Sequence, residues 1–209
     1  ALTTFTIEAW VQPAGDNASG VILRKARSSD GAVNYELALE GGYAKVTVGG
    51  NSLVADILPI LGGRWAHLAA TLDGTTQELT LTVYTENVLG DENYKTVRLS
   101  AGVLPPPVGN GPLTIGAASG GLVGLVDEVR IWSVARSGAQ IEADRLVALS
   151  TVPAGLSSYY RFEDGGATVE DFSHRLNTDT PTVRRNLRVV GTLVAGAQVI
   201  AGNPGLTDA

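Results

Sequence analysis

The sequence predicts an all-β protein, an antiparallel jelly-roll β-sandwich with one short helix. Segments in which apolar and polar side chains alternate recur along most of the chain, and turn residues separate them roughly every 8–12 residues. A helical period occurs in only one segment. The length of 209 residues suits a two-sheet jelly roll better than an immunoglobulin domain, and the chain has no cysteine for the Cys…Trp…Cys pattern of that domain.

The predicted strands are short and alternate with a period of two. In the first of them, Phe5, Ile7, Ala9 and Val11 share one face. Gly41-Gly42 predicts a hairpin turn, and the stretch DGTT (73–76) predicts a hairpin loop. The predicted strands cover residues 3–11, 20–26, 34–40, 43–49, 64–72, 77–84, 112–116 and 121–132.

The one segment with a helical period is SGAQIEADRLVAL (137–149). Ser137 is a suitable N-cap residue, and Gln140 follows three residues later, as in a capping box. We therefore expect one short helix in this segment. The run Pro105–Pro107 is expected to lie in a loop, because proline lacks the N–H that a central strand must donate.

Composition excludes several classes of function. The net charge is −6 and the basic residues are scattered, with a single small cluster around Arg184 and Arg185, so we expect no nucleic-acid partner. No segment approaches the roughly 20 apolar residues of a membrane span, so we expect no membrane insertion. The two histidines, His67 and His174, leave little room for histidine-based metal or triad chemistry. Because no methionine occurs, even at position 1, we expect the chain to be part of a larger protein.

Five segments, in this order, carry a resemblance to a known family. The chain resembles the laminin-G-like, concanavalin A-like jelly-roll modules of large secreted proteins, mostly bacterial. The resemblance implies a sandwich of the concanavalin A-like lectin/glucanase type, with residues 1–209 as a single LamG-like domain and residues 150–209 completing it. The strand-like tail 186–202 is expected to supply an edge strand. The five segments are FTIEAWVQP (5–13), GRWAHLAATLDGTTQELTLTVY (63–84), PLTIG (112–116), GLVGLVDEVRIWSVARSGAQIEA (121–143) and LSSYYRFEDGGATVEDFS (156–173).

The same resemblance implies a function. It implies a non-catalytic recognition or adhesion module, secreted or at the cell surface, that binds a glycan or a surface protein and belongs to a multidomain parent chain. An alternative is a structural spacer or protein–protein interaction domain of a surface protein or toxin. A third is a polysaccharide-active enzyme, but the E-x-D-x-x-E pattern of such enzymes on this fold is absent, so we expect no enzyme activity.

Asp127 suggests a calcium site. Strict alternation places it on an otherwise apolar strand face with Val129 and Ile131, where an unpaired carboxylate would be costly. Ca²⁺ prefers oxygen ligands, and the stretch FEDGGATVEDFS (162–173) is rich in them. The alternatives are hydrogen bonds from backbone N–H groups, a contact with Arg161, or a strand bulge that turns the side chain outward. The predicted metal ligands are Asp127, Glu163, Asp164 and Asp171.

Tyr94 is the predicted ligand-binding residue for a glycan. It lies in the polar stretch GDENYK (90–95), which predicts a loop, so its ring is expected to be available for stacking on a sugar. Trp10, Trp65 and Trp132 lie within the family-like segments and are expected to pack inside the protein. His67 is expected to have a structural role.

Overall fold

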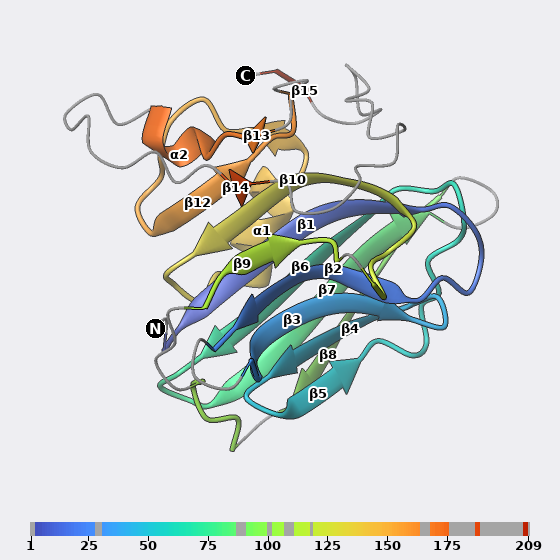
Figure 1. Ribbon diagram of the computed structural model, residues 1–209, viewed down its shortest axis with the longest axis horizontal. Coiled ribbons are helices and arrows are strands. Elements are labelled where there is room, and N and C mark those ends of the chain that lie inside the picture. The colour runs from blue at the N-terminus through green and yellow to red at the C-terminus, as the bar shows by residue number, and fades with distance from the viewer. Residues whose placement is uncertain are drawn as a thin grey trace.

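The computed structural model describes residues 3–27, 31–86, 91–99, 102–106, 111–117, 119–163, 168–175, 187–188 and 207–208. Two antiparallel sheets stack face to face in these residues (Figure 1), which confirms the predicted all-β sandwich. Apolar side chains that alternate along each strand point into the space between the sheets, so the same pattern that predicted the strands also builds the core.

The larger sheet has six strands in the order β12-β10-β1-β6-β7-β8. The DGTT stretch forms the predicted hairpin between β6 and β7. Lys95 of the edge strand β8 lies opposite Val83, on the side of the strand that faces the core. The strands are β1 (Phe5–Pro13), β6 (Ala66–Asp73), β7 (Glu78–Glu86), β8 (Glu92–Leu99), β10 (Gly124–Trp132) and β12 (Leu156–Tyr160).

The smaller sheet has five strands in the order β5-β4-β3-β2-β9. Gly41 and Gly42 form the predicted hairpin turn. Their φ values of 58° and 87° are ones that residues other than glycine rarely adopt. The strands are β2 (Gly20–Ala26), β3 (Val33–Glu40), β4 (Tyr43–Val48), β5 (Asn51–Val54) and β9 (Leu113–Ile115).

The predicted helix is present but shorter than expected. Helix α1 (Gly138–Asp144) begins after Ser137 with the predicted capping box, in which Ser137 and Gln140 satisfy each other's backbone N–H groups. It ends at residue 144 rather than 149, because Arg130 donates hydrogen bonds to the carbonyl groups of Asp144 and Val147, which draws the chain onto the sheet.

The remaining elements are short and follow α1. They are β11 (Val147–Ala148), β13 (Thr168–Val169), α2 (Phe172–Arg175), β14 (Leu187–Arg188) and β15 (Thr207–Asp208). Strand β12 fills the sheet edge beside β10. Of the tail 186–202, only β14 is described, and it pairs with β13 instead of either large sheet. The rest of the predicted tail strand lies outside the described residues, and the single-domain assignment of residues 1–209 stays a prediction.

Residues 133–149, which we call the cover segment, lie across the outer face of the six-stranded sheet. Arg136 of this segment donates a 2.8 Å hydrogen bond to Glu8 of β1, and both side chains are buried. The guanidinium of Arg136 also lies 4.0 Å from the ring centre of Trp132. Burial by itself would raise the pKa of Glu8, but His67, Arg136 and Arg130 outweigh it and lower the pKa below its usual value. The cover segment is therefore held by a buried ion pair.

We predict that removing one partner of this ion pair lowers the free energy of unfolding more than replacing both partners with apolar residues. Arg136→Met leaves the Glu8 carboxylate buried without its arginine partner and should lower the free energy of unfolding by about 3–5 kcal/mol. The double variant Glu8→Leu/Arg136→Met should be more stable than the single variant, because neither buried charge is left alone. Urea unfolding at neutral pH measures both.

The matched control is Arg98→Met, which removes an arginine whose pairing with Glu78 is exposed. This change should cost less than about 1 kcal/mol. A double variant as unstable as Arg136→Met would show that the pair does not hold the cover segment in this way.

Candidate ligand-binding site

Four ring-bearing side chains form a row across the outer face of the six-stranded sheet. Trp10 of β1 lies directly opposite His67 of β6, which lies opposite Tyr84 of β7, which lies opposite Tyr94 of β8. Successive ring centres are 5.2, 6.1 and 5.7 Å apart, and the rings of Tyr84 and Tyr94 are nearly parallel. We call these four residues the aromatic row. The in-register antiparallel pairing of the strands produces it.

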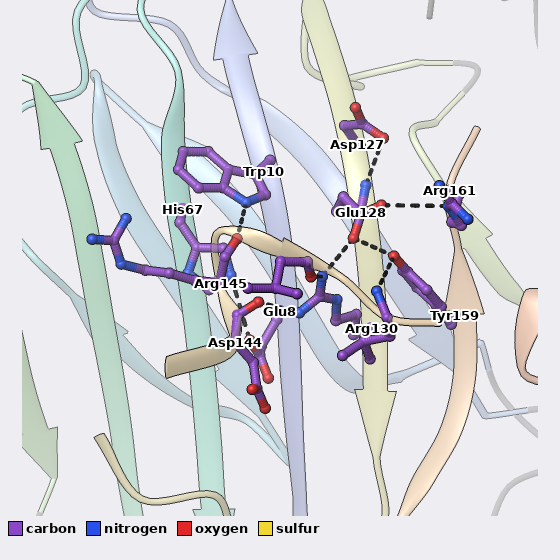
Figure 2. A network of polar contacts seen from close by, with 12 residues as sticks. Glu8, Trp10, His67, Asp127, Glu128, Arg130, Asp144, Arg145, Tyr159 and Arg161 are labelled. Carbon is purple, nitrogen blue, oxygen red and sulfur yellow. Dashed lines mark hydrogen bonds and ion pairs between the residues drawn. The ribbon is translucent and has the colours of Figure 1, made fainter. Parts of the chain in front are cut away.

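The cover segment buries all of the row except its last member. Trp10 donates a 2.8 Å hydrogen bond from Nε1 to the carbonyl oxygen of Arg145, and the Arg145 guanidinium lies 4.4 Å from the ring centre of Tyr84. Figure 2 shows this hydrogen bond, with Arg145 on a segment of chain that crosses in front of the strand that carries Trp10. Tyr94 is 71% exposed, whereas the other three residues of the row are buried. The row therefore ends in one aromatic face that is open to a ligand.

Two carboxylates lie near this open face. Glu92 precedes Tyr94 by two residues on the same side of β8, and Glu142 forms a hydrogen bond with Tyr84, whose ring stacks on Tyr94. Nη2 of Arg145 lies 2.7 Å from Oε2 of Glu92 and 3.1 Å from Oε1 of Glu142. The hydrogen bond from Arg145 lowers the pKa of Glu142, so this carboxyl is ionised at neutral pH. Burial, together with Glu142, raises the pKa of Tyr84, so its hydroxyl keeps its proton. The site thus combines a flat apolar surface with charged hydrogen-bond acceptors, the groups that a sugar ring and its hydroxyls require.

The structure corrects the predicted setting of Tyr94. Tyr94 does not lie in a loop but on β8, where it is paired with Tyr84. The charged and polar residues at the start of this strand hide its alternation, because both of its faces are solvated there. The assignment of Tyr94 as a ligand-binding residue stays a prediction. Sequence reasoning missed its neighbours Glu92, Glu142 and Arg145, and only recognition of the β7–β8 hairpin would have revealed Tyr84.

A β-bulge decides the position of Asp127. Glu8 pairs with Arg130 and Trp10 pairs with Asp127, so two residues of β10, Glu128 and Val129, face the single residue between Glu8 and Trp10. The extra residue shifts the alternation by one position. Val129 therefore packs in the core, while Asp127 lies beside Trp10 on the outer face. The predicted placement of Asp127 on the apolar face is thus wrong. Two of the alternatives are present together: the bulge, and a hydrogen bond from a backbone N–H group, that of Glu128.

Glu128 occupies the bulge with a φ of 50°, in the left-handed region, which costs about 1–2 kcal/mol for a residue with a side chain. Buried contacts offset this strain. The carboxylate accepts a 2.5 Å hydrogen bond from Arg130 and another from the hydroxyl of Tyr159, and it lies 3.9 Å from Nε of Arg161. Figure 2 shows these side chains converging on Glu128, with Asp127 next to them. The bulge therefore has a fixed geometry.

The Asp127 carboxyl is partly buried and lies among like charges. Its Oδ1 accepts a 2.8 Å hydrogen bond from the backbone N–H of Glu128. Burial, followed by the negative charges of Glu128 and Glu163, raises the pKa of Asp127 to about 7, although its hydrogen bond and Arg161 act in the opposite direction. At neutral pH a substantial fraction of this carboxyl is protonated.

The four predicted metal ligands are only partly brought together. Asp127 and Glu163 are close enough for their charges to interact. Asp171 instead accepts hydrogen bonds at Oδ1 from the backbone of Tyr159 and from Ser173, although its Oδ2 is buried without a hydrogen-bond partner among the described residues. Asp164 lies outside the described residues. Within the described part of the chain, no group of three or more histidine or acidic side chains is placed to hold a metal ion. The calcium site stays a prediction.

Comparison with known proteins places this geometry in a family. The family model described as the concanavalin A-like lectin/glucanases superfamily matches residues 1–142, which confirms the resemblance and the sandwich type expected from the sequence. No curated protein matches. A heptameric SAP-like pentraxin from Limulus polyphemus is similar in structure, with 14% identity, a TM-score of 0.44, and coverage of 67% of this chain and 68% of that one. None of the helices among the described residues is long and apolar enough to cross a membrane.

The raised pKa of Asp127 predicts a pH dependence of stability. Because the pKa is about 7 in the folded protein and about 4 in the unfolded chain, the folded state binds more protons between these values. The contribution of Asp127 to stability is therefore fully present below about pH 4 and is lost as the pH rises through about 7. Asp127→Asn should remove this dependence and should raise the free energy of unfolding at pH 8 by about 1–2 kcal/mol, a figure reduced for partial exposure.

Urea unfolding at pH 5 and pH 8 measures the effect. Asp56→Asn makes the same charge change at an exposed position and serves as the control. Equal pH dependence in the wild type and in Asp127→Asn would contradict the assignment.

Proposed function

Because the chain belongs to the concanavalin A-like lectin/glucanase superfamily, we propose that it is a non-catalytic recognition module that binds carbohydrate through Tyr94. The family match supports a lectin-type binding module in general terms. The choice of carbohydrate over protein as ligand rests on the chemistry of the open end of the aromatic row.

The observation that carries the proposal is the exposed ring of Tyr94 beside ionisable acceptors. Its ring is backed by the nearly parallel ring of Tyr84, which fixes its orientation before any ligand arrives. The CH groups on one face of a pyranose would stack on this ring, and the sugar hydroxyls would donate hydrogen bonds to Glu92 and Glu142. Because the rings are already ordered, binding loses little conformational entropy on the protein side.

We place this activity outside the cell, in a secreted or cell-surface protein, as a recognition or adhesion domain of a larger chain. The family match supports this setting, because the modules that the sequence resembles belong to large secreted proteins. A glycan-binding module in such a chain would hold the other domains at a surface that carries the glycan.

We predict that removal of the Tyr94 ring weakens glycan binding. Tyr94→Ala should lower the affinity of every glycan that binds by about fivefold, because stacking on an aromatic face contributes on the order of 1 kcal/mol. Tyr94→Trp should retain binding. A glycan array identifies ligands, and calorimetry with the best of them measures the affinities.

Val123→Ala is the matched control. Val123 is as exposed as Tyr94, but it immediately precedes β10 and lies away from the aromatic row. Full affinity in Tyr94→Ala would contradict the site. An array without any binding would favour a spacer or protein–protein module instead. Release of reducing sugar from a polysaccharide would point to an enzyme.

We also propose that calcium binds near the bulge, with Asp127 and Glu163 as ligands and Asp164 and Asp171 as further candidates. Burial is the largest cause of the raised pKa of Asp127, and the charges of Glu128 and Glu163 add to it. A divalent cation would neutralise this repulsion among the carboxylates. After EDTA treatment, millimolar Ca²⁺ should raise the melting temperature and Mg²⁺ should not. At a concentration of 100 times Kd the stabilisation is about 2.7 kcal/mol.

Asp127→Asn should abolish the calcium response, whereas Asp56→Asn should retain it. A melting temperature that calcium leaves unchanged would rule out this site, and the hydrogen bond from the Glu128 N–H would then be the main stabilising contact of Asp127.

A further inference from the structure

We infer that the Tyr94 site selects glycans that carry protonated amino groups, such as glucosamine oligomers, over their acetylated and acidic counterparts. This inference rests on the proposed carbohydrate-binding function and names its ligand class. It follows from the way in which the cover segment distributes charge around the exposed ring.

The charges beside Tyr94 are unequal in number. Glu92 and Glu142 share a single nitrogen of Arg145, so two carboxylates are balanced by one guanidinium. Across the strand from Glu92, Glu86 is paired with Arg64 and adds no net charge. Lys95, the residue after Tyr94, lies on the opposite, core-facing side of β8, so the outer face of the sheet edge next to the ring is negative.

The carboxylates of Glu92 and Glu142 are also more exposed to a ligand than the guanidinium of Arg145. Arg145 is only 3% exposed, because it lies over the ring of Tyr84 beneath the two carboxylates. The side chains of Glu92 and Glu142 are 49% and 52% exposed. A ligand that rests on Tyr94 meets the carboxylates and not the guanidinium. The positive charge serves to hold the acids in place.

An ammonium group fits this arrangement in two ways. It is attracted to the face of an aromatic ring, and it forms charge-assisted hydrogen bonds with carboxylates. An acetamido group in the same position has no charge for either interaction. A sulfated or carboxylated sugar would be repelled by Glu92 and Glu142. The expected preference for an amino sugar over its acetylated form is about tenfold.

The test compares three oligosaccharides of equal length by calorimetry: β-1,4-linked glucosamine, its fully acetylated counterpart, and a sulfated glycan. At a pH that protonates the amines, the glucosamine oligomer should bind about tenfold more tightly than the acetylated one, and added salt should reduce the difference. Glu92→Gln/Glu142→Gln should bring the two affinities together. Glu40→Gln, on the other sheet, should preserve the preference.

The outcomes separate this inference from the proposed function. Equal affinities for the two oligomers in the wild type, with binding lost in Tyr94→Ala, would overturn the amine preference and leave carbohydrate binding intact. A preference that survives in Glu92→Gln/Glu142→Gln would also overturn the inference. If none of the three oligosaccharides nor any array glycan binds, both proposals fail.

Discussion

The buried ion pair between Glu8 and Arg136 is the contact on which the candidate site depends. It joins the middle of β1 to the cover segment. Arg130 and Trp10 of the sheet also donate hydrogen bonds to backbone carbonyl groups of this segment, and Arg145 lies over the ring of Tyr84. Two charges removed from water separate only at high cost, so the pair fixes the position of the whole segment. That position in turn brings Glu142 and Arg145 to Tyr84, whose ring stacks on that of Tyr94. The ligand-facing chemistry at the sheet edge is thus set by a contact in the interior.

The row of cross-strand neighbours on the outer face has two chemically different ends. At the β8 end, Tyr94 offers an exposed ring whose neighbours are ordered by Arg145. At the β10 end, the bulge at Glu128 turns Asp127 outward beside Trp10, among other negative charges. The first end is where we propose that a sugar binds, and the second is where we propose a cation. Trp10 and His67 are buried between these two ends.

The sequence was sufficient for features that depend on local pattern. Alternation located most strands of both sheets, and Ser137 with Gln140 marked the start of the helix. It was insufficient where a single residue changes the register. A bulge moves every later side chain of the strand to the other face of the sheet. The residues around Glu128 contain no sequence pattern that predicts the bulge. The contact of Arg145 with Glu92 was equally hidden, because these residues lie 53 positions apart and meet only when the cover segment docks.

Lys95 opposes the pairing of the edge strand β8 with strands of neighbouring molecules. An edge strand presents unpaired backbone groups to any other strand, and a flat apolar edge invites sheets to fuse. Lys95 lies on the core-facing side of β8, opposite Val83, so a strand added there would have to bury its ammonium group. Lys95 therefore disfavours the pairing of β8 with an edge strand of a second copy, so it opposes fusion of the sheets of neighbouring molecules.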